Sequence, residues 1–181
     1  YGPHRFVVAT PGVDAAPVAA GSGGAGSLLC VAVLGRHKGQ DVLILGLPLI
    51  RRRVPDATLV IVGGGPYDEE LRALADGAPD GSVVFAGQVS EEDLPRYYAL
   101  GDVFAMPRRS RLAGMEVEGW GNVFIEAAAC AKPVVVGDSG GAREALIDGE
   151  TGLLVDGANV DAVADAVGDL LIDPDRARAM G

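Results

Sequence analysis

The fold of this chain is decided by one stretch of its sequence, LLCVAVLGRHKGQDVLILGLPLIRRRVPDATLVIV (28–62). It opens with an uninterrupted apolar run at 28–34, the pattern of a strand that is buried on both faces of a sheet. Residues 40–53 then read as a helix that ends in three arginines, where positive charge complements the helix dipole. A second apolar run follows at 57–62. A strand, a helix and a strand in this order predict a βαβ unit with parallel strands.

The same alternation continues to the end of the chain. Further apolar runs of strand length lie at 82–87, 103–107, 133–137 and 151–155. Helical patterns lie at 67–75, 90–101, 122–131, 142–148 and 159–173, and a last short helix starts at Pro174. We therefore predict an α/β fold with a Rossmann-like, doubly wound parallel sheet of about six strands. Such a sheet binds ligands beyond the carboxyl ends of its strands, which here are followed by the loops 35–39, 63–66, 87–90, 107–121 and 138–141.

The first part of the chain differs in composition from the rest. The run PGVDAAPVAAGSGGAGS (11–27) is rich in Gly, Pro, Ala and Ser, which is typical of a linker. We therefore predict a linker, or the end of a preceding domain, at 1–27, and one ligand-binding domain at 28–181.

Charge and composition argue against several classes of protein. The formal net charge is -10, whereas a protein that binds nucleic acid needs a basic surface. Cys30 and Cys130 lie inside apolar runs and are expected to be buried, reduced thiols. His4 and His37 are the only histidines, and no metal-ligand spacing is present. Without a signal peptide or a membrane-spanning apolar run in the sequence, we expect a cytoplasmic protein that binds no nucleic acid.

Two glycine-containing loops follow the first two strands. GRHKG (35–39) places Arg36 and Lys38 where they would neutralise a phosphate, although a solvated turn would use the same residue types. GGGP (63–66) would let the backbone approach a ligand closely. It is not a dinucleotide fingerprint, because Asp68 stands where the motif requires its third glycine.

The longest loop, PRRSRLAGMEVEGWG (107–121), leads into the helix predicted at 122–131. A helix N-terminus suits an anion, and long loops in compact domains are usually functional or disordered. Glu118 precedes the helix and Glu126 lies one turn inside it, and the glycines between them permit a turn that brings both to one ligand. Carboxylates accept hydrogen bonds from sugar and ribose hydroxyls. Alternatively, Glu126 only complements the helix dipole.

Together these segments resemble the retaining family-4 glycosyltransferases of the GT-B fold. The resemblance rests on Glu118-x7-Glu126 within EVEGWGNVFIEAAACAKPVVVGDSGGAREALIDGETGLLV (116–155). It is supported, in family order, by KGQDVLI (38–44), LVIVGGGP (59–66) and VVFAGQVSEEDLPRYYALGDVFAMP (83–107). Within the family, MPRRSRLAGMEVEGWGNVFIEA (106–127) is most similar to phosphatidylinositol mannosyltransferases. The resemblance implies that residues 28–181 form the C-terminal, nucleotide-sugar donor-binding half of a GT-B fold.

The resemblance also implies roles for individual residues. Lys38 would hold the diphosphate and stabilise charge on the leaving nucleotide, and Glu118 would face the donor sugar, so these two are the predicted catalytic residues. Glu126 would bind the ribose hydroxyls. The predicted substrate-binding residues are Arg36, Gly65, Gly87, Gly119, Gly121, Asn122, Val123 and Glu126.

One position departs from the family pattern. An arginine usually stands five positions before the lysine, where this chain has Val33. Arg36 would substitute for it from a different angle; otherwise the donor is bound more weakly, or the diphosphate is held by other groups.

The implied reaction is a retaining transfer of a sugar, mannose by analogy in one loop, from a nucleoside diphosphate sugar to an acceptor hydroxyl. The donor would be a GDP- or UDP-sugar, and neither a cofactor nor a metal is expected. The acceptor site, and any membrane contact, would belong to an N-terminal acceptor domain outside this chain. We therefore expect this chain to bind donor but to transfer nothing alone, and the full-length enzyme to be cytoplasmic or peripheral at the inner membrane face.

Other classes remain open from the sequence. An NAD(P)-binding oxidoreductase domain shares the alternation, but it lacks support from the glycine motif and from the strand end at Gly87, where an acidic residue is expected. A non-catalytic nucleotide-binding module would have the same pattern. A nearer alternative is another GT-B enzyme, such as a sucrose-type synthase or a phosphorylase-like relative, and the short loops argue against the phosphorylase.

Overall fold

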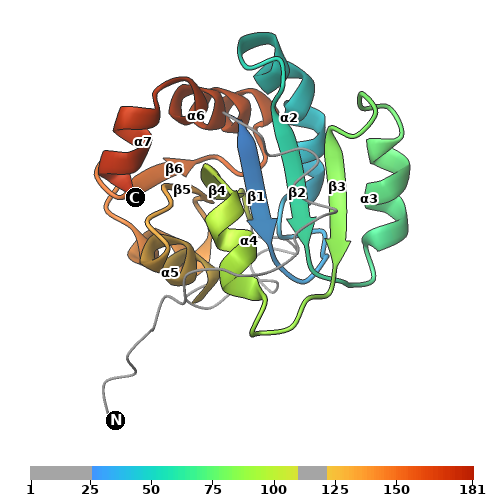
Figure 1. Ribbon diagram of the computed structural model, residues 1–181, viewed down its shortest axis with the longest axis horizontal. Helices are drawn as coiled ribbons and strands as arrows, with labels where there is room; N and C mark the ends of the chain where they lie inside the picture. Colours follow the sequence, from blue (N-terminus) through green and yellow to red (C-terminus); the bar gives the residue numbers. More distant parts are fainter. Residues whose placement is uncertain (1–25, 110–121) are drawn as a thin grey trace.

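The centre of the fold is a parallel sheet with the strand order β3-β2-β1-β4-β5-β6 (Figure 1). The computed structural model describes residues 26–109 and 122–181. Within them the strands are β1 (Ser27–Val31), β2 (Thr58–Val62), β3 (Val83–Gly87), β4 (Val103–Met106), β5 (Val134–Gly137) and β6 (Gly152–Val155). The predicted doubly wound parallel sheet of about six strands is confirmed.

Strand β1 lies at the point where the order of the sheet reverses. It pairs in parallel with β2 on one side and with β4 on the other. All five of its residues are buried, as are those of β2, which explains their continuous apolar sequence. In a sheet of this order the crevice beyond the carboxyl end of the reversal point is the usual place for a ligand.

Helices cover both faces of the sheet. They are α2 (Gln40–Arg53), α3 (Asp68–Ala75), α4 (Leu94–Leu100), α5 (Asn122–Ala129), α6 (Val160–Ile172) and α7 (Pro174–Met180). Helices α2, α3 and α6 lie on one face, with α2 against both of the others, and α4 and α5 lie on the opposite face (Figure 1). No helix in the described part of the chain is long and apolar enough to cross a membrane.

Two of the three arginines at the end of α2 bind other segments of the fold. Arg51 donates to the carbonyl oxygen of Ala57 at 2.6 Å, ahead of β2. Arg53 pairs with Asp169 of α6 at 2.6 Å. The two side chains therefore fasten the end of α2 to the next strand and to the neighbouring helix.

Two helices differ from the sequence prediction. Helix α4 starts at Leu94 and not at residue 90, because the Ser90 hydroxyl donates to Asp93 at 2.7 Å and forms a separate turn ahead of the helix. The segment predicted as an α-helix at 142–148 is a 3-10 helix, η2 (Gly140–Ala145). It ends before the predicted helix does, because Leu146 is extended, with φ −147° and ψ 162°.

Candidate functional site

A cavity of about 390 Å³ lies beyond the carboxyl ends of β1, β2 and β3. Its walls come from the residues that follow these strands and from the first turns of α4 and α5. They are largely apolar and include Val33, Val62, Val89, Leu94 and Val123. Val33 is 62% exposed although it is apolar. A small, mostly apolar hollow at this end of a doubly wound sheet suits a flat ring system.

Gly63 and Gly64 form part of the wall of this cavity. Gly63 has a φ of +134°, and a Cβ there would stand 2.0 Å from the carbonyl oxygen of Ala32. A Cβ at Gly64 would meet the Gln88 side chain at 3.0 Å. Gly87 ends β3 with a φ of +72° and turns the chain into Gln88 and Val89. Gly63 and Gly87 have backbone conformations that only glycine adopts without strain, so the course of the chain around the cavity depends on these two glycines.

Gly65, predicted as a substrate-binding residue, lies in a different position. A Cβ there would be 2.4 Å from the carbonyl oxygen of Leu34, so this glycine packs against the loop that follows β1. It supports that loop and is not among the residues that line the cavity. Its predicted contact with a nucleoside stays a prediction.

Lys38 lies in the loop between β1 and α2 and is only 8% exposed. Its backbone N–H donates to the carbonyl oxygen of Gly35 at 2.9 Å, which closes the loop. Burial raises the pKa of the Cys30 thiol to about 12, and the charge of Lys38 opposes this rise. The ammonium group is therefore close enough to β1 for its charge to act on a residue within the strand.

Arg36 is directed toward α3. Its guanidinium pairs with Glu70 at 3.0 Å and stacks over the ring of Tyr67 at 4.4 Å. The pair is about half exposed, so it is weak and open to exchange with another anion. Whether Arg36 replaces the family arginine missing at Val33 stays a prediction.

The residues that leave β4, Pro107–Arg109, form what we call the β4 exit segment. The backbone N–H of Arg109 donates to the carbonyl oxygen of His37 at 2.9 Å. Its guanidinium holds the Asp41 carboxylate through two hydrogen bonds, at 3.0 and 2.6 Å. The segment thus joins the Lys38 loop and the start of α2, and it leads directly to the residues that precede α5.

Helix α5 carries three of the predicted substrate-binding residues. Asn122 is exposed at its first position, and Val123 lines the cavity. Glu126, one turn further on, is half-buried, and its Oε2 accepts a hydrogen bond from the Tyr98 hydroxyl of α4 at 2.8 Å. Burial raises the pKa of the Tyr98 phenol, and the hydrogen bond to Glu126 raises it further. The phenol therefore keeps its proton and acts as the donor.

The described residues bring part of the predicted site together. Lys38, Gly87, Val123 and Glu126 all lie at the carboxyl end of the sheet. The predictions for Glu118, Gly119 and Gly121 fall outside the described residues. Among the described residues, no group of three or more His, Cys, Asp or Glu side chains could hold a metal ion.

The sequence points to Val123 and to the first glycines of the GGGP loop, which line the cavity, but not to the rest of its wall or to Tyr98. Val33 was seen only as a missing arginine, and Gln88, Val89 and Leu94 were not singled out, although Gln88 and Val89 follow β3 directly. For Tyr98 the usable signal is its position four residues after Leu94, which puts both on one side of α4.

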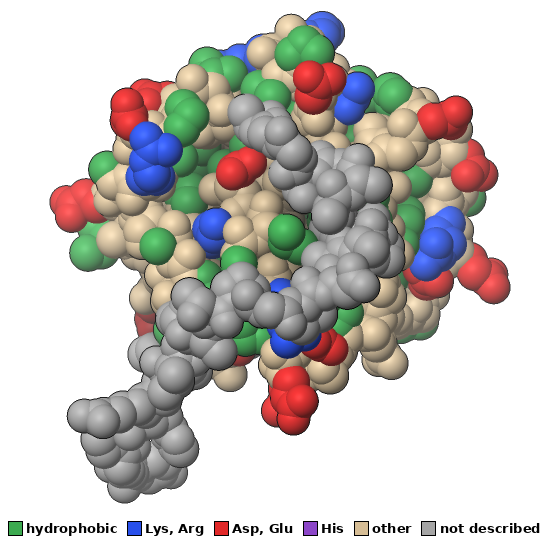
Figure 2. All heavy atoms as spheres, viewed as in Figure 1, with side chains coloured by type: hydrophobic (Ala, Val, Ile, Leu, Met, Phe, Trp, Pro, Cys, Tyr) green, Lys and Arg blue, Asp and Glu red, His purple; other side chains and the backbone are tan. Residues whose placement is uncertain are grey.

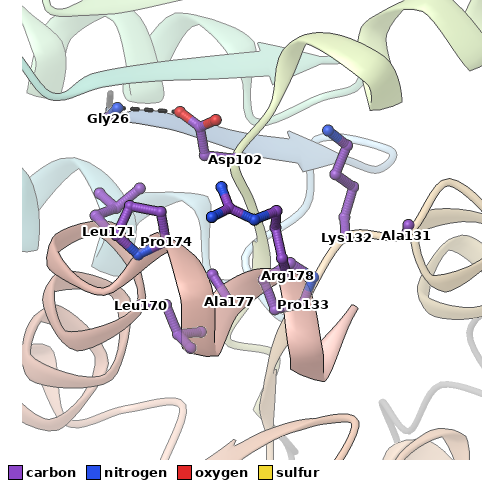
Figure 3. A pocket seen from close by; sticks show the side chains of 10 residues that line it. All are labelled: Gly26, Asp102, Ala131, Lys132, Pro133, Leu170, Leu171, Pro174, Ala177 and Arg178. Carbon is purple, nitrogen blue, oxygen red and sulfur yellow. Dashed lines mark hydrogen bonds between the residues drawn. The ribbon is translucent and has the colours of Figure 1, made fainter. Parts of the chain in front are cut away.

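A second cavity, of about 300 Å³, lies at the opposite, amino end of the sheet. Figure 3 shows charged side chains around it, and several have partners within the chain. The Asp102 carboxylate accepts from the backbone N–H groups of Gly26 and Ser27, at 3.0 and 2.9 Å. Lys132 donates to the carbonyl oxygen of Ala99 at 3.1 Å, and Arg178 pairs with Asp175. These groups fasten chain segments to one another.

Charges on the surface are mixed. On the face shown in Figure 2, basic side chains stand among acidic ones around the rim, in keeping with the net charge of -10. The glycine-lined cavity, Lys38 and Glu126 lie at the end of the sheet where doubly wound folds usually bind ligands.

Comparison with known proteins identifies the family. The model of the family "Glycosyl transferases group 1" matches residues 22–181, and the chain belongs to this family. That membership confirms the glycosyltransferase prediction and sets aside the oxidoreductase alternative.

Several relatives of this chain are named as mannosyltransferases. The chain is 56% identical over 155 residues to the GDP-mannose-dependent alpha-(1-6)-phosphatidylinositol monomannoside mannosyltransferase of Mycolicibacterium smegmatis. It is 44% identical over 154 residues to the corresponding monoacylated-substrate enzyme of Corynebacterium glutamicum. Each match covers 85% of this chain, which spans 41% and 40% of the two relatives.

Solved structures agree on the fold. A sucrose-phosphate synthase from Thermosynechococcus elongatus superposes with a TM-score of 0.72 at 30% identity, over 86% of this chain and 38% of that protein. Anabaena Alr3699/HepE, solved in complex with UDP, superposes with a TM-score of 0.77 at 23% identity, over 93% of this chain and 46% of that protein. The sheet described above is thus the Rossmann-like half of a GT-B fold.

Proposed function

We propose that this chain binds GDP-mannose and forms the donor-binding half of a retaining mannosyltransferase. The observation that carries the proposal is the apolar, glycine-floored cavity with Val123 in its wall and Glu126 one turn away on the same helix. The names of the mannosyltransferase relatives supply the nucleobase and the sugar, which the sequence alone left open between GDP- and UDP-sugars.

Each part of the donor has a matching group. The nucleobase occupies the cavity, whose volume of about 390 Å³ and apolar walls fit a flat ring system. The ribose hydroxyls donate to Glu126, a carboxylate with acceptor capacity beyond its bond to Tyr98. The diphosphate lies over the loop between β1 and α2, where Lys38 and the N-terminus of α2 both favour negative charge.

Lys38 then acts on the leaving group. During transfer the bond between the sugar's anomeric carbon and the diphosphate oxygen breaks, and negative charge grows on that diphosphate. The acceptor hydroxyl oxygen bonds to the anomeric carbon on the same face and passes its proton to the departing diphosphate oxygen. A buried ammonium group at the diphosphate stabilises the transition state more than the ground state, which is how it accelerates the reaction. Glu118 holds the sugar, and no metal or other cofactor takes part.

Binding of the acceptor is assigned to a part of the enzyme outside this chain. Because the chain spans about two fifths of its relatives' length, we assign the acceptor site and any membrane contact to an N-terminal acceptor domain of the same enzyme. In this proposal the whole enzyme works at the inner face of the membrane, on a phosphatidylinositol mannoside acceptor.

Calorimetric titration of the purified chain with GDP, UDP, ADP and NAD tests the proposal. We expect saturable binding of GDP, much weaker binding of the others, and clearly weakened but still measurable GDP binding in Glu126→Ala. The matched control is Glu150→Ala, which removes the same charge from the exposed turn before β6, at the other end of the sheet.

The outcomes separate the candidates. Tight UDP binding with weak GDP binding would keep the donor site but overturn the choice of nucleobase. Equal GDP binding by Glu126→Ala and the wild type would overturn the site. If GDP binds as expected, mannose transfer after addition of the N-terminal domain distinguishes an enzyme from a non-catalytic nucleotide-binding module.

A further inference from the structure

We infer that Tyr98 is a positioning residue that sets the orientation of Glu126, and through it the preference of the site for a nucleotide with intact ribose hydroxyls. The inference rests on the proposed function, since it assigns the partner that fixes the ribose-binding carboxylate. Tyr98 touches no ligand in this scheme and acts only through Glu126.

The hydrogen bond joins two elements that are distant in the sequence. Tyr98 of α4 donates to Oε2 of Glu126 of α5 at 2.8 Å, across 28 positions of the chain. A hydrogen bond to a charged acceptor is stronger than one between neutral groups. The bond occupies one side of the carboxylate and leaves Oε1 and the remaining lone pairs of Oε2 for a ligand.

The donor is held rigidly. Tyr98 is 2% exposed, and its ring lies 5.8 Å from that of Phe104 in β4. Phe104 in turn meets Phe124 of α5 edge to face at 5.9 Å. The three rings form a packed row from α4 over β4 to α5 on one face of the sheet, so the hydroxyl has little freedom to leave Glu126.

The acceptor is placed at the edge of the cavity by the same two helices. Leu94 and Tyr98 are four residues apart on α4, and Val123 and Glu126 are three apart on α5, so each pair shares one side of its helix. Leu94 and Val123 line the cavity. The Tyr98–Glu126 bond therefore lies one helical turn behind two cavity walls, where the ribose would follow the base.

A carboxylate without this bond would have more rotamers available. Glu126 is half-buried near a cavity that is open to solvent, and a glutamate side chain loses much rotamer freedom when it is fixed. Because Tyr98 holds one oxygen, the rotamer freedom of Glu126 is already reduced in the free protein, and less of it is lost when the ligand binds. Removing the hydroxyl should weaken ligands that use Glu126 and spare ligands that do not.

The test compares GDP with dideoxy-GDP, which lacks both ribose hydroxyls, on four proteins: wild type, Tyr98→Phe, Glu126→Ala and the double variant. We expect the wild type to prefer GDP strongly. Tyr98→Phe should weaken GDP by about 3- to 10-fold, the effect of having to fix one rotamer-rich side chain on binding, and dideoxy-GDP by less than about 2-fold. In the Glu126→Ala background the same change should have no further effect on GDP.

Tyr97→Phe is the matched control. It removes a hydroxyl from the adjacent residue of α4, and it should leave both affinities unchanged. Titrations are run below the melting temperature of every variant, so that unfolding does not enter the comparison. Should Tyr98→Phe fold poorly, its cycle with Glu126→Ala still separates the two roles, because a purely structural loss would persist in the double variant.

The results distinguish this inference from the proposed function. Wild-type protein that does not prefer GDP over dideoxy-GDP, or Glu126→Ala that binds GDP normally, would overturn the proposed function. A normal wild type and Glu126→Ala, together with a Tyr98→Phe that binds GDP like the wild type or loses both nucleotides equally, would overturn the positioning role alone.

Discussion

The two ends of the sheet each have a cavity, of about 390 Å³ at the carboxyl end and about 300 Å³ at the amino end, and each has one of the chain's two lysines. At the amino end Asp102 and Lys132 bind backbone groups of the chain itself (Figure 3). At the carboxyl end glycines and exposed apolar residues such as Val33 form the walls. A cavity lined by charged side chains that bind the chain itself is therefore weaker evidence for a ligand site than a cavity lined by glycines and exposed apolar side chains.

The largest difference is expected between the two lysines. Lys38→Ala should cost about 1.5–3 kcal/mol of GDP binding, a factor of roughly 10 to 150 in Kd, because a charge-assisted contact with the diphosphate is lost. Lys132→Ala, the same change at the other end of the sheet, should leave the Kd unchanged. Calorimetry on both variants measures this. Similar Kd values for the two variants would mean that the loop between β1 and α2, which carries Lys38, is not the diphosphate site.

The next effect concerns the pair that fastens the carboxyl end. Asp41→Asn should lower the free energy of unfolding by about 1.5–2.5 kcal/mol, because the side chains of Arg109 and Asp41 are only 23% and 16% exposed and Arg109 would lose a charged partner. Asp161→Asn is the control, since Asp161 also lies in the first turn of a helix but is exposed. Urea unfolding measures both. An equal loss in both variants would indicate a helix-dipole effect only.

A smaller effect is expected at the amino end. Asp102→Ala should lower the free energy of unfolding by about 1–2 kcal/mol, because the buried N–H groups of Gly26 and Ser27 lose their acceptor beside the cavity that Gly26 and Asp102 line. GDP affinity should not change. Asp102→Asn, which keeps one oxygen acceptor, should lose less. A drop in GDP affinity in either variant at full foldedness would contradict the separation of the two ends.

The smallest effect is expected at the rim of the amino-end cavity. Arg178→Ala should change the free energy of unfolding by less than about 0.5 kcal/mol, because Arg178 is highly exposed and its pair with Asp175 is within one turn of α7. The same urea experiment measures it. A loss of more than about 1 kcal/mol, twice the expected maximum, would show that Arg178 contributes more to holding α7 against the sheet.

The sequence allowed the sheet to be predicted well because its strands are buried on both faces and read as unbroken apolar runs. Helix α2 spans the predicted residues from Gln40 to Arg53. The failures were local and had local causes. At Leu146 the extended backbone ends the expected helix early, and at Ser90 a side-chain hydrogen bond delays the start of α4.

The site was less accessible from the sequence. The family resemblance pointed to Lys38 and Glu126, but the cavity wall combines residues that follow three strands, and no single segment shows it. Pairs such as Tyr98 with Glu126 and Asp41 with Arg109 join residues 28 and 68 positions apart. Such partners are chosen by the packing of whole elements, which the spacing of residues along one segment does not encode.

The β4 exit segment has a consequence for how this domain can change over time. Three glycines, at the start of α2, at the end of β5 and after β6, lie against its backbone: a Cβ would stand 2.1 Å from the Pro107 carbonyl oxygen at Gly39, and 2.0 and 2.2 Å from the Arg108 carbonyl oxygen at Gly137 and Gly157. A library of all amino acids at these positions should return glycine almost alone, although none of them lines the cavity. Variation at Val33, Gln88 and Val89, by contrast, alters the cavity wall and leaves the β4 exit segment unchanged. New donor preferences should therefore evolve first at these three positions.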